Sequence, residues 1–575
     1  MKNILLRIIF SFSFSIISAQ NIPSPSEFLG YELGTQFTRH HQVVSYFNSV
    51  AAATEQVKLS TYGTTYEGRP LQIASISSAK NLSNLDEIQK NHLIQSGLKE
   101  GIVTSLAPKS IVWLSYNVHG NEAVSTEAAM KTIYSLVTEK SEWLENVVVL
   151  MDPCINPDGR DRYVNWYNQV KSTPYDSKPI ANEHYEDWPG GRYNHYYFDL
   201  NRDWAWASQK ETQQRLKVYH KWYPQIHVDF HEQGVNSPYY FAPAAEPLHE
   251  IITDFQRDFQ HTIGKNHAKY FDNEGWSYFT KEVFDLLYPG YGDTYPMYHG
   301  AIGMTYEQGG SGRAGLSIKN EIGDYLTLSD RISHHYTTGL STVETAHKNS
   351  ALLNSEFKKY FTKKKAKYAT YVMEGEPEKL AGLRKLLDTH HIPYSSPKTK
   401  TSIKGWDYVK QKNTTHTFDT GALVLDGNGK RSRLIQALFE PNAKLSDSVT
   451  YDITSWSLPY AFGLKAMASQ QSFKNTVPFK EDTNKTNTSS KAYAYAAAWR
   501  SFEDGKFLAA LLKEKIRVRY NLKPIQNGGQ RWAEGSVFIL KGENKKLEDF
   551  DATLRRVANE TKQQITPLAS GFSDR

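Results

Sequence analysis

Between about residues 110 and 350, short apolar segments of strand length alternate with helical patterns. The strand-like segments are 110–118, 146–153, 225–232 and 300–308. In 126–140 the apolar residues Met130, Ile133, Tyr134 and Val137 recur at i, i+3, i+4 and i+7, which indicates one face of a helix. Buried strands that alternate with amphipathic helices predict an α/β fold, with a mostly parallel or mixed twisted sheet covered by helices.

The length of 575 residues exceeds one ordinary hydrophobic core, so two or three domains are expected. We assign 22–350 to the main α/β domain and interpret the lysine-rich stretch 345–368 as its boundary. A smaller α/β or α+β accessory region follows, with a module at 365–468, a polar linker at 469–492 and a small module at 493–575. The last residues contain no evident closing element, which is consistent with truncation of that module.

The N-terminal segment "MKNILLRIIFSFSFSIISAQ" combines two cations with a short apolar stretch that ends in small residues. This pattern predicts a signal peptide over residues 1–19. The apolar stretch Ile8 to Ile17 is short for a bilayer core of about 30 Å, so we expect no membrane anchor and a secreted or periplasmic protein. The net charge of +6 is dispersed along the chain, and no nucleic-acid partner is implied.

Polar residues at the predicted strand ends indicate a metal site. His119 and Glu122 follow the strand at 110–118, and Cys154 is the only cysteine, so nitrogen and oxygen atoms must hold any metal. A catalytic zinc needs a third protein ligand, and His227 and His231 are candidates in the strand-like segment at 225–232. Their strand alternation places them roughly 13 Å apart, so one ion cannot bind both. His231, at the strand end, is the better ligand, and His227 is interpreted as structural.

Two further groups fit hydrolytic chemistry. Glu307 ends the strand at 300–308, where a carboxylate that does not bind the metal can accept a proton from water and pass it to the leaving amine. Asn201 and Arg202 place an amide beside a guanidinium, which is suited to bidentate capture of a carboxylate. For an isolated Asn-Arg pair, an ion pair between the arginine and a carboxylate inside the protein is the more ordinary interpretation.

Five short motifs in order resemble the zinc carboxypeptidases of the carboxypeptidase A type. They are "HGNE" at 119–122, "NPDG" at 156–159, "DLNR" at 199–202, "DFH" at 229–231 and "TYE" at 305–307, and the resemblance covers about 60–350. Each motif is weak alone, but five in the same order form a strong signal. The resemblance implies an exported zinc metallocarboxypeptidase that hydrolyses the C-terminal amide bond of peptides.

The resemblance also assigns roles to individual residues. His119, Glu122 and His231 would bind one zinc ion per chain, and Glu307 would be the general base and acid. Asn201 and Arg202 would hold the free C-terminal carboxylate of a peptide substrate, and "NPDG" would be a structural turn. The family has a mobile tyrosine before its catalytic glutamate. If Asp293 matches the family's aspartate in that loop, Tyr288 is nearest among the three tyrosines that the loop offers.

The sequence departs from the family pattern in two places. The family's second arginine, which polarises the scissile carbonyl, is expected about a dozen residues beyond "NPDG", but this stretch has arginines only at Arg160 and Arg162. The residue that stabilises the oxyanion is therefore unassigned. The loop around Gly292, where the family sets its side-chain preference, has neither a bulky apolar residue nor an acid.

Parts of the sequence are also compatible with functions other than a peptide hydrolase. A metal-dependent peptide- or glycan-binding module on the same scaffold would not need Glu307, and a hydrolase of cell-wall peptides or modified amino acids would share the zinc chemistry. The G-x-G-x-x-G spacing at 310–315 is typical of dinucleotide binding, but glycines there equally suit a loop that substrate approaches. Cys154 is interpreted as a small buried residue and not as a nucleophile.

Overall fold

A mixed eight-stranded sheet forms the centre of the first part of the chain, with strand order β1-β2-β4-β3-β5-β10-β6-β8. The four central strands, β4, β3, β5 and β10, run parallel, and antiparallel pairs flank them. The strands span Val57–Thr64 (β1), Pro70–Ile76 (β2), Ser110–Tyr116 (β3), Val147–Asp152 (β4), Ile226–Gln233 (β5), Tyr239–Tyr240 (β6), Tyr278–Phe279 (β8) and Ile302–Gly309 (β10). The α/β fold predicted from the sequence is confirmed.

This computed structural model describes residues 22–362, 366–447, 449–453, 455–480, 488, 491–527 and 529–572. The predicted signal peptide at 1–19 lies outside these residues. The chain divides into two compact units. The first contains the described parts of Met1–Lys364, Gly429–Leu438 and Asn442–Trp456, and the second contains those of Lys365–Asn428, Phe439–Pro441 and Ser457–Arg575.

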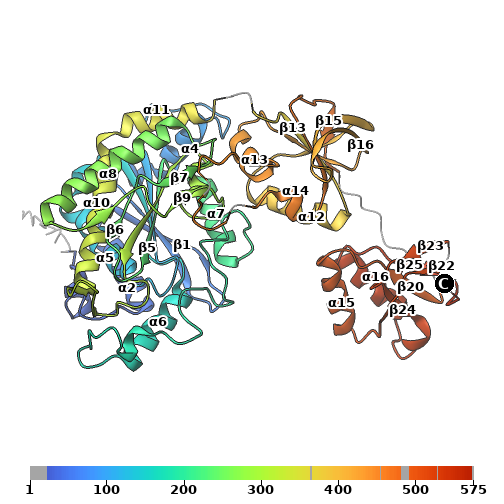
Figure 1. The fold of residues 1–575 in the computed structure, drawn as a ribbon, viewed down its shortest axis with the longest axis horizontal. Helices are drawn as coiled ribbons and strands as arrows, with labels where there is room; N and C mark the ends of the chain where they lie inside the picture. Colours follow the sequence, from blue (N-terminus) through green and yellow to red (C-terminus); the bar gives the residue numbers. More distant parts are fainter. Residues whose placement is uncertain are drawn as a thin grey trace, which may run out of the picture. The chain divides into compact units, whose positions relative to one another are not determined.

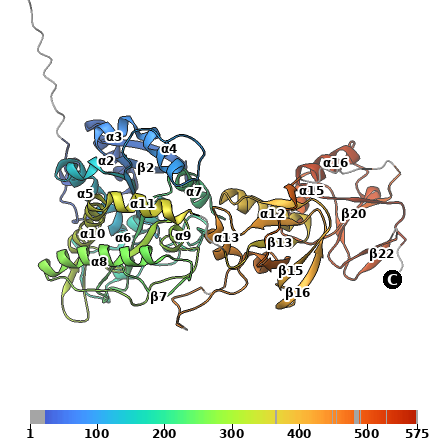
Figure 2. The same cartoon turned by 90° about the horizontal axis from the view of Figure 1, so that it is seen from above.

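Helices cover both faces of the sheet in the first unit (Figure 1). On one face Val112, Leu114 and Tyr116 pack in a core with residues of α2 (His40–Ala53), α5 (Val124–Thr138), α8 (Asp254–Glu274) and α10 (Leu328–Lys348). On the other face Trp113 contacts Tyr219 of α7 (Lys210–Trp222). Figure 2 shows α5, α10 and α8 along one side of this unit and α7 toward the other. Because strand side chains alternate, each buried strand serves both cores.

The remaining elements of the first unit are shorter or lie at its periphery. The helices are α1 (Pro25–Leu29), α3 (Ala79–Ser83), α4 (Leu85–Gln95), α6 (Pro157–Val170), α9 (Thr294–Met297), α11 (Ser350–Tyr360) and α13 (Ser432–Phe439). The short strands are β7 (Ala245–Leu248), β9 (Asp285–Leu286), β11 (Ser317–Lys319) and β12 (Tyr325–Thr327).

The loop after β3 is held by the start of α6. Asn117 has a φ of 58°, in the left-handed region, and its side chain donates to the carbonyls of His119, Gly120 and Glu122. A Cβ on Gly120 would lie 2.2 Å from the backbone carbon of Gly159, so only glycine fits there. The "HGNE" and "NPDG" motifs are therefore two sides of one packed turn.

The start of α6 also contains a buried ion pair. Asn156 caps the helix by accepting from the backbone N–H of Gly159 at 3.0 Å. Arg160 is fully buried, pairs with Glu127 of α5 and donates to the carbonyl of Thr38 at 2.8 Å. Arg160, one of the two arginines in the stretch where a catalytic arginine is expected, is thus occupied in holding the helix against α5.

The second unit contains two separate antiparallel sheets. Seven strands take the order β16-β15-β18-β13-β17-β14-β19, and four take the order β21-β24-β20-β25. The first sheet has β13 (Thr370–Glu374), β14 (Ser395–Pro397), β15 (Thr401–Asp407), β16 (Lys412–Phe418), β17 (Leu423–Asp426), β18 (Lys465–Ser469) and β19 (Thr476–Pro478), with α12 (Pro377–Thr389) and α14 (Leu458–Ala461). The second has β20 (Ala494–Ala497), β21 (Arg519–Tyr520), β24 (Val537–Leu540) and β25 (Thr566–Leu568), with α15 (Glu503–Lys513) and α16 (Phe550–Glu560), next to the hairpin of β22 (Ile525–Asn527) and β23 (Gln530–Trp532).

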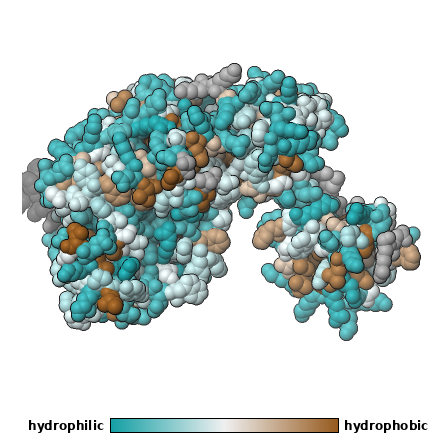
Figure 3. Space-filling view, in the orientation of Figure 1, coloured by the Kyte–Doolittle hydropathy of each residue, from teal (hydrophilic) through white to brown (hydrophobic). Residues whose placement is uncertain are grey.

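The surface of the first unit is mostly hydrophilic on the face drawn in Figure 3, with hydrophobic residues in small separate groups. Among the residues that the structure describes, no helix has the length and apolar character needed to cross a membrane.

Candidate metal centre

Three side chains meet beyond the carboxyl ends of the central strands. His119 and Glu122 follow β3 and His231 lies near the end of β5, and their ligand atoms lie within 4.8 Å of one another. The Nδ1 atoms of His119 and His231 are 3.2 Å apart, and they lie 2.7 and 3.0 Å from the two carboxylate oxygens of Glu122. Two ligand atoms on a tetrahedral zinc lie about 3.3 Å apart, so this donor set fits zinc.

Carboxylates also contact the far sides of both imidazoles. The Nε2 atom of His119 lies 3.0 Å from Asp199, and that of His231 lies 3.7 Å from Asp229. Such partners fix the ring orientation and leave the Nδ1 lone pair free for a metal. The arrangement is typical of zinc sites in which each ligand histidine has an outer carboxylate.

The charges of this cluster require a cation. Burial opposes ionisation of Glu122, but His119 and His231 hold its pKa well below the ordinary value. Burial likewise works against a charged His231, yet Asp229 and Glu122 raise its pKa well above 6.5. Without a metal, the imidazole itself must carry the positive charge that the carboxylates need, and a divalent ion would replace that proton.

His227 lies outside this cluster. It is fully buried, its Nε2 atom lies 2.9 Å from Asp229, and its ring stacks on Trp113. Because β5 is extended, the offset of four residues places His227 roughly 13 Å from His231 along the strand. His227 therefore orients Asp229, which in turn faces His231.

Glu307 stands beside the three convergent residues. In the parallel pairing of β10 with β5, Glu307 is in register with His231, so the two side chains point to the same face. Among the described residues, its carboxylate has no hydrogen-bond or ion-pair partner. Burial, aided by Glu122 and opposed by His231, raises the pKa of Glu307 to about 8. A carboxyl group with this pKa can exchange a proton near neutral pH.

A cavity of about 380 Å³ lies in front of these groups. Its walls include His119, Glu122, Glu307, Asn201 and Arg202. The Asn201 oxygen accepts from the backbone N–H of Gly292 at 2.8 Å. Asn201 and Arg202 thus reach the same space as the metal-binding cluster, and together they form the polar end of the cavity.

The guanidinium of Arg202 is paired within the chain. Its Nε and Nη2 atoms lie 3.0 and 2.9 Å from one oxygen of Asp452, and it stacks over the Tyr291 ring at 4.6 Å. Tyr291 lines the cavity, whereas Tyr288 is not among its lining residues. Tyr288 is buried, and its hydroxyl donates to the Arg202 carbonyl at 3.0 Å. In this structure Tyr288 supports Arg202 from behind, and Tyr291 is the tyrosine that faces the cavity.

Arg192 is a cavity residue that the sequence motifs did not indicate. It lines the cavity, and its guanidinium donates to Glu122 at 3.3 Å and to Asp199 at 3.0 Å. It lies in an irregular segment, seven residues before Asp199, and not in the stretch after "NPDG" where an arginine was sought. Its spacing to "DLNR" was the only available signal. The Arg192 side chain is one-third exposed, whereas Glu122 is almost fully buried.

Glu232 was also missed. It is buried beside His231, pairs with Arg331 at 2.8 Å and accepts from the backbone N–H of Val124 at the start of α5. Its own backbone N–H donates to Glu122 at 2.9 Å. Burial, partly offset by Arg331, raises the pKa of Glu232 to about 7. Glu232 therefore ties the loop after β3 to the end of β5.

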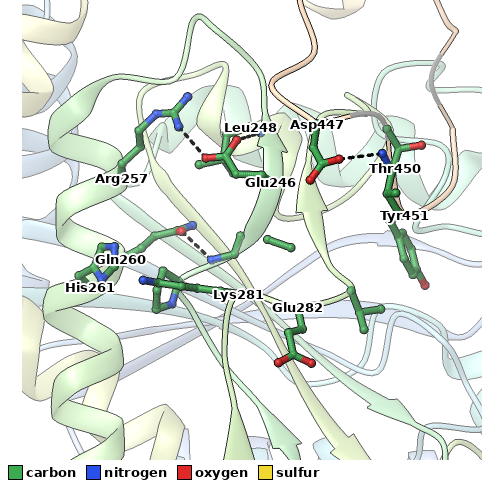
Figure 4. A pocket seen from close by; sticks show the side chains of 15 residues that line it. Glu246, Leu248, Arg257, Gln260, His261, Lys281, Glu282, Asp447, Thr450 and Tyr451 are labelled. Atoms are coloured by element: carbon green, nitrogen blue, oxygen red, sulfur yellow. Dashed lines mark hydrogen bonds and ion pairs between the residues drawn. The ribbon is translucent and has the colours of Figure 1, made fainter.

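A second cavity, of about 830 Å³, shares Val283 and Tyr451 with the first. Figure 4 shows it between α8 and the Asn442–Trp456 segment, with Arg257 paired to Glu246 at 3.3 Å. Its walls include both acidic and basic side chains. Val283 has a φ of 68°, a strained conformation for a β-branched residue.

Two alternative motifs do not form sites of their own. The 310–315 glycine pattern leads from β10 through a turn into β11, whereas dinucleotide binding requires a helix after the glycines. Cys154 is buried beside Asn117, and burial raises the pKa of its thiol well above the ordinary value. The glycine pattern therefore lacks the helix that a dinucleotide site needs. Cys154 lacks the exposed, electropositive surroundings of a nucleophilic thiol.

Comparisons with known proteins give one family match and several distant structural similarities. Residues 43–312 match the zinc carboxypeptidase family. No curated protein matches the chain. Among solved structures, a metallo-carboxypeptidase from Burkholderia cenocepacia is 15% identical, with 53% of this chain and 69% of that chain covered and a TM-score of 0.37. Carboxypeptidase A from Helicoverpa armigera is 16% identical, with 58% and 76% covered and a TM-score of 0.38.

The family match spans β3, β5 and β10 and so includes the loop after β3 and the ends of the two strands that carry His231 and Glu307. Residues 43–312 are therefore similar to the zinc carboxypeptidase family, and they contain the His119, Glu122 and His231 cluster that is placed to bind a metal ion, as expected of a zinc metallopeptidase.

Proposed function

We propose that the protein is an exported zinc-dependent carboxypeptidase that hydrolyses the C-terminal amide bond of peptides with a free terminal carboxylate. The observation that carries the proposal is the placement of Glu307, without a partner among the described residues, in the same cavity as His119, Glu122 and His231. A binding module would need the metal cluster but not a buried acid beside it.

His119, Glu122 and His231 would hold the zinc ion, with one ion per chain. Zinc bound there supplies Lewis-acid chemistry, because it lowers the pKa of a water molecule to about 7 and polarises a carbonyl oxygen. Asp199 and Asp229 orient the two imidazoles from behind.

Glu307 would move the proton. Its carboxylate accepts a proton from the attacking water and gives it to the leaving amine nitrogen, which makes the amine a neutral leaving group. Its place in register with His231 keeps this carboxylate next to the metal ligands without making it one of them.

Arg192 would stabilise the oxyanion that develops on the scissile carbonyl. Its guanidinium is at the cavity wall and is held in place by Glu122 and Asp199. Asn201 and Arg202, which line the same cavity, would bind the terminal carboxylate of the substrate. The cation that the sequence lacks after "NPDG" is thus supplied from the segment before "DLNR".

Export rests on the sequence of residues 1–19, with two cations, a short apolar stretch and small residues at its end. A protein with this segment would act in the periplasm or outside the cell.

Replacing His231 with Ala should abolish stoichiometric zinc, since it removes one of three protein ligands. The matched control is His227→Ala, which lies on the same strand and should retain about one zinc per chain. Metal content after dialysis, measured by inductively coupled plasma mass spectrometry on folded protein, checks both. Zinc that survives loss of His231 and disappears with His227 would contradict the assignment.

Replacing Glu307 with Gln should preserve zinc content and lower kcat by about 100- to 10,000-fold, because the amide cannot accept the proton. The control Glu321→Gln changes an exposed acid and should leave turnover unchanged. Steady-state hydrolysis of an N-acylated dipeptide measures the effect. Near-normal turnover in Glu307→Gln would remove this residue from the mechanism and favour the binding module.

Replacing Arg192 with Met should lower kcat by roughly 100- to 1,000-fold with little change in KM, because the oxyanion exists only in the transition state. The control is Arg162→Met, an arginine of α6 that donates to the Gly190 carbonyl outside the cavity. Zinc content must be measured beside kcat and KM, since Arg192 contacts Glu122. A rise in KM with unchanged kcat would instead assign Arg192 to substrate binding.

Replacing Arg202 with Met should erase most of the preference for a free terminal carboxylate, since charged hydrogen bonds of this kind contribute about tenfold or more. The measurement is the ratio of kcat/KM for a peptide and its C-terminally amidated form, with Arg313→Met as the control. Equal rates for both peptides in the unmutated protein, or cleavage from the amino end, would contradict a carboxypeptidase.

A further inference from the structure

One segment of the catalytic unit comes from far along the chain. Asn442–Trp456 belongs to the first compact unit although it lies outside the region that matches the family. Tyr451 of this segment lines the cavity that holds the metal-binding cluster, and Asp452 contacts Arg202. The cavity is therefore completed by residues that the family match does not include.

Several contacts hold this segment against the rim of the cavity. The backbone N–H of Tyr451 donates to Asp285 at 2.7 Å, and Ser446 donates to Glu246. Trp456 packs with Tyr288 and Tyr291 in a buried cluster, and its indole N–H donates to the Ala437 carbonyl at 2.7 Å. Anchors on both sides of Asp452 thus set the position of its carboxylate.

The carboxylate of Asp452 makes the contacts that Arg202 would make with a substrate. One oxygen accepts from both Nε and Nη2 at 3.0 and 2.9 Å, on a guanidinium that is already stacked on Tyr291. Asp452 is 43% exposed, whereas Arg202 is 23% exposed. An exposed acid on a less exposed guanidinium can be exchanged for another carboxylate that arrives through the cavity.

We propose that Asp452 is a specificity-determining residue that competes with the terminal carboxylate of the substrate for Arg202. This rests on the proposed function of the site. A peptide with a free C-terminus binds by exchanging one carboxylate for another on the same guanidinium, so its net gain from Arg202 is smaller than it would be from an unpaired guanidinium. A peptide with a neutral C-terminus makes no such exchange and leaves the Arg202–Asp452 pair intact. Asp452 thereby narrows the preference for free over amidated ends.

The experiment compares Asp452→Asn, Asp452→Glu and the unmutated zinc-loaded protein on an N-benzoylated glycyl-phenylalanine and its C-terminal amide. Asp452→Asn removes the competing charge, so KM for the free acid should fall about 5- to 30-fold, with kcat and the amide kinetics little changed. Asp452→Glu retains the carboxylate, so its KM for the free acid should stay close to that of the unmutated protein. The control Asp447→Asn removes a charge from the same segment without touching Arg202 and should leave KM unchanged.

Two results would overturn the proposal. An unchanged KM for the free acid in Asp452→Asn would show that Asp452 does not compete. An equal rise in kcat/KM for both peptides would show that the segment blocks the cavity without regard to the substrate end.

A binding measurement separates this proposal from the proposed function. Calorimetry with the same free acid and amide on Glu307→Gln protein requires no turnover. Tighter binding of the free acid alone after Asp452→Asn supports the competition even if the unmutated protein hydrolyses neither peptide, an outcome that would refute only the carboxypeptidase activity. Unchanged binding of the free acid refutes the competition, whatever the hydrolysis rate.

Discussion

The structure depends on a concentration of buried acids at the ends of parallel strands. Glu122, Asp199 and Asp229 surround two imidazoles, and Glu307 stands beside them. Burying these carboxylates is unfavourable unless a positive charge compensates them. A divalent ion bound by His119, Glu122 and His231 would meet this requirement. The fixed turn after β3 and the capped start of α6 keep the ligands together before any metal arrives.

Much of the α/β domain could be predicted because short stretches of the sequence determine its strands and helices. The apolar strands and the helix at 124–138 follow periodicities that any short window reveals, and β5 alternates so regularly that His227 and His231 could be separated by strand geometry alone. The parallel arrangement then places the ends of β3, β5 and β10 at one edge. His119, Glu122, His231 and Glu307 meet there for that reason.

The rest of the site depends on contacts that no local pattern encodes. Arg192 lies in irregular chain between α6 and α7, where no periodicity predicts which side chain reaches the cavity and its spacing to "DLNR" is the only signal. The choice between Tyr288 and Tyr291 depends on the local path of a loop that Trp456 packs against. Asp452 lies 250 residues from Arg202 along the chain, so their pairing follows only from the tertiary fold. The sequence leaves open an internal ion pair for Arg202, but only the fold identifies Asp452 as its partner.

An anomalous difference map from crystals of the zinc-loaded protein, measured at the zinc absorption edge, would locate the metal directly. The assignment of His119, Glu122 and His231 as ligands predicts a single anomalous peak that lies about 2.0–2.2 Å from the Nδ1 atoms of His119 and His231 and from the Glu122 carboxylate, with Glu307 nearby but not coordinated. A peak elsewhere, coordination by His227, or direct ligation by Glu307 would contradict it.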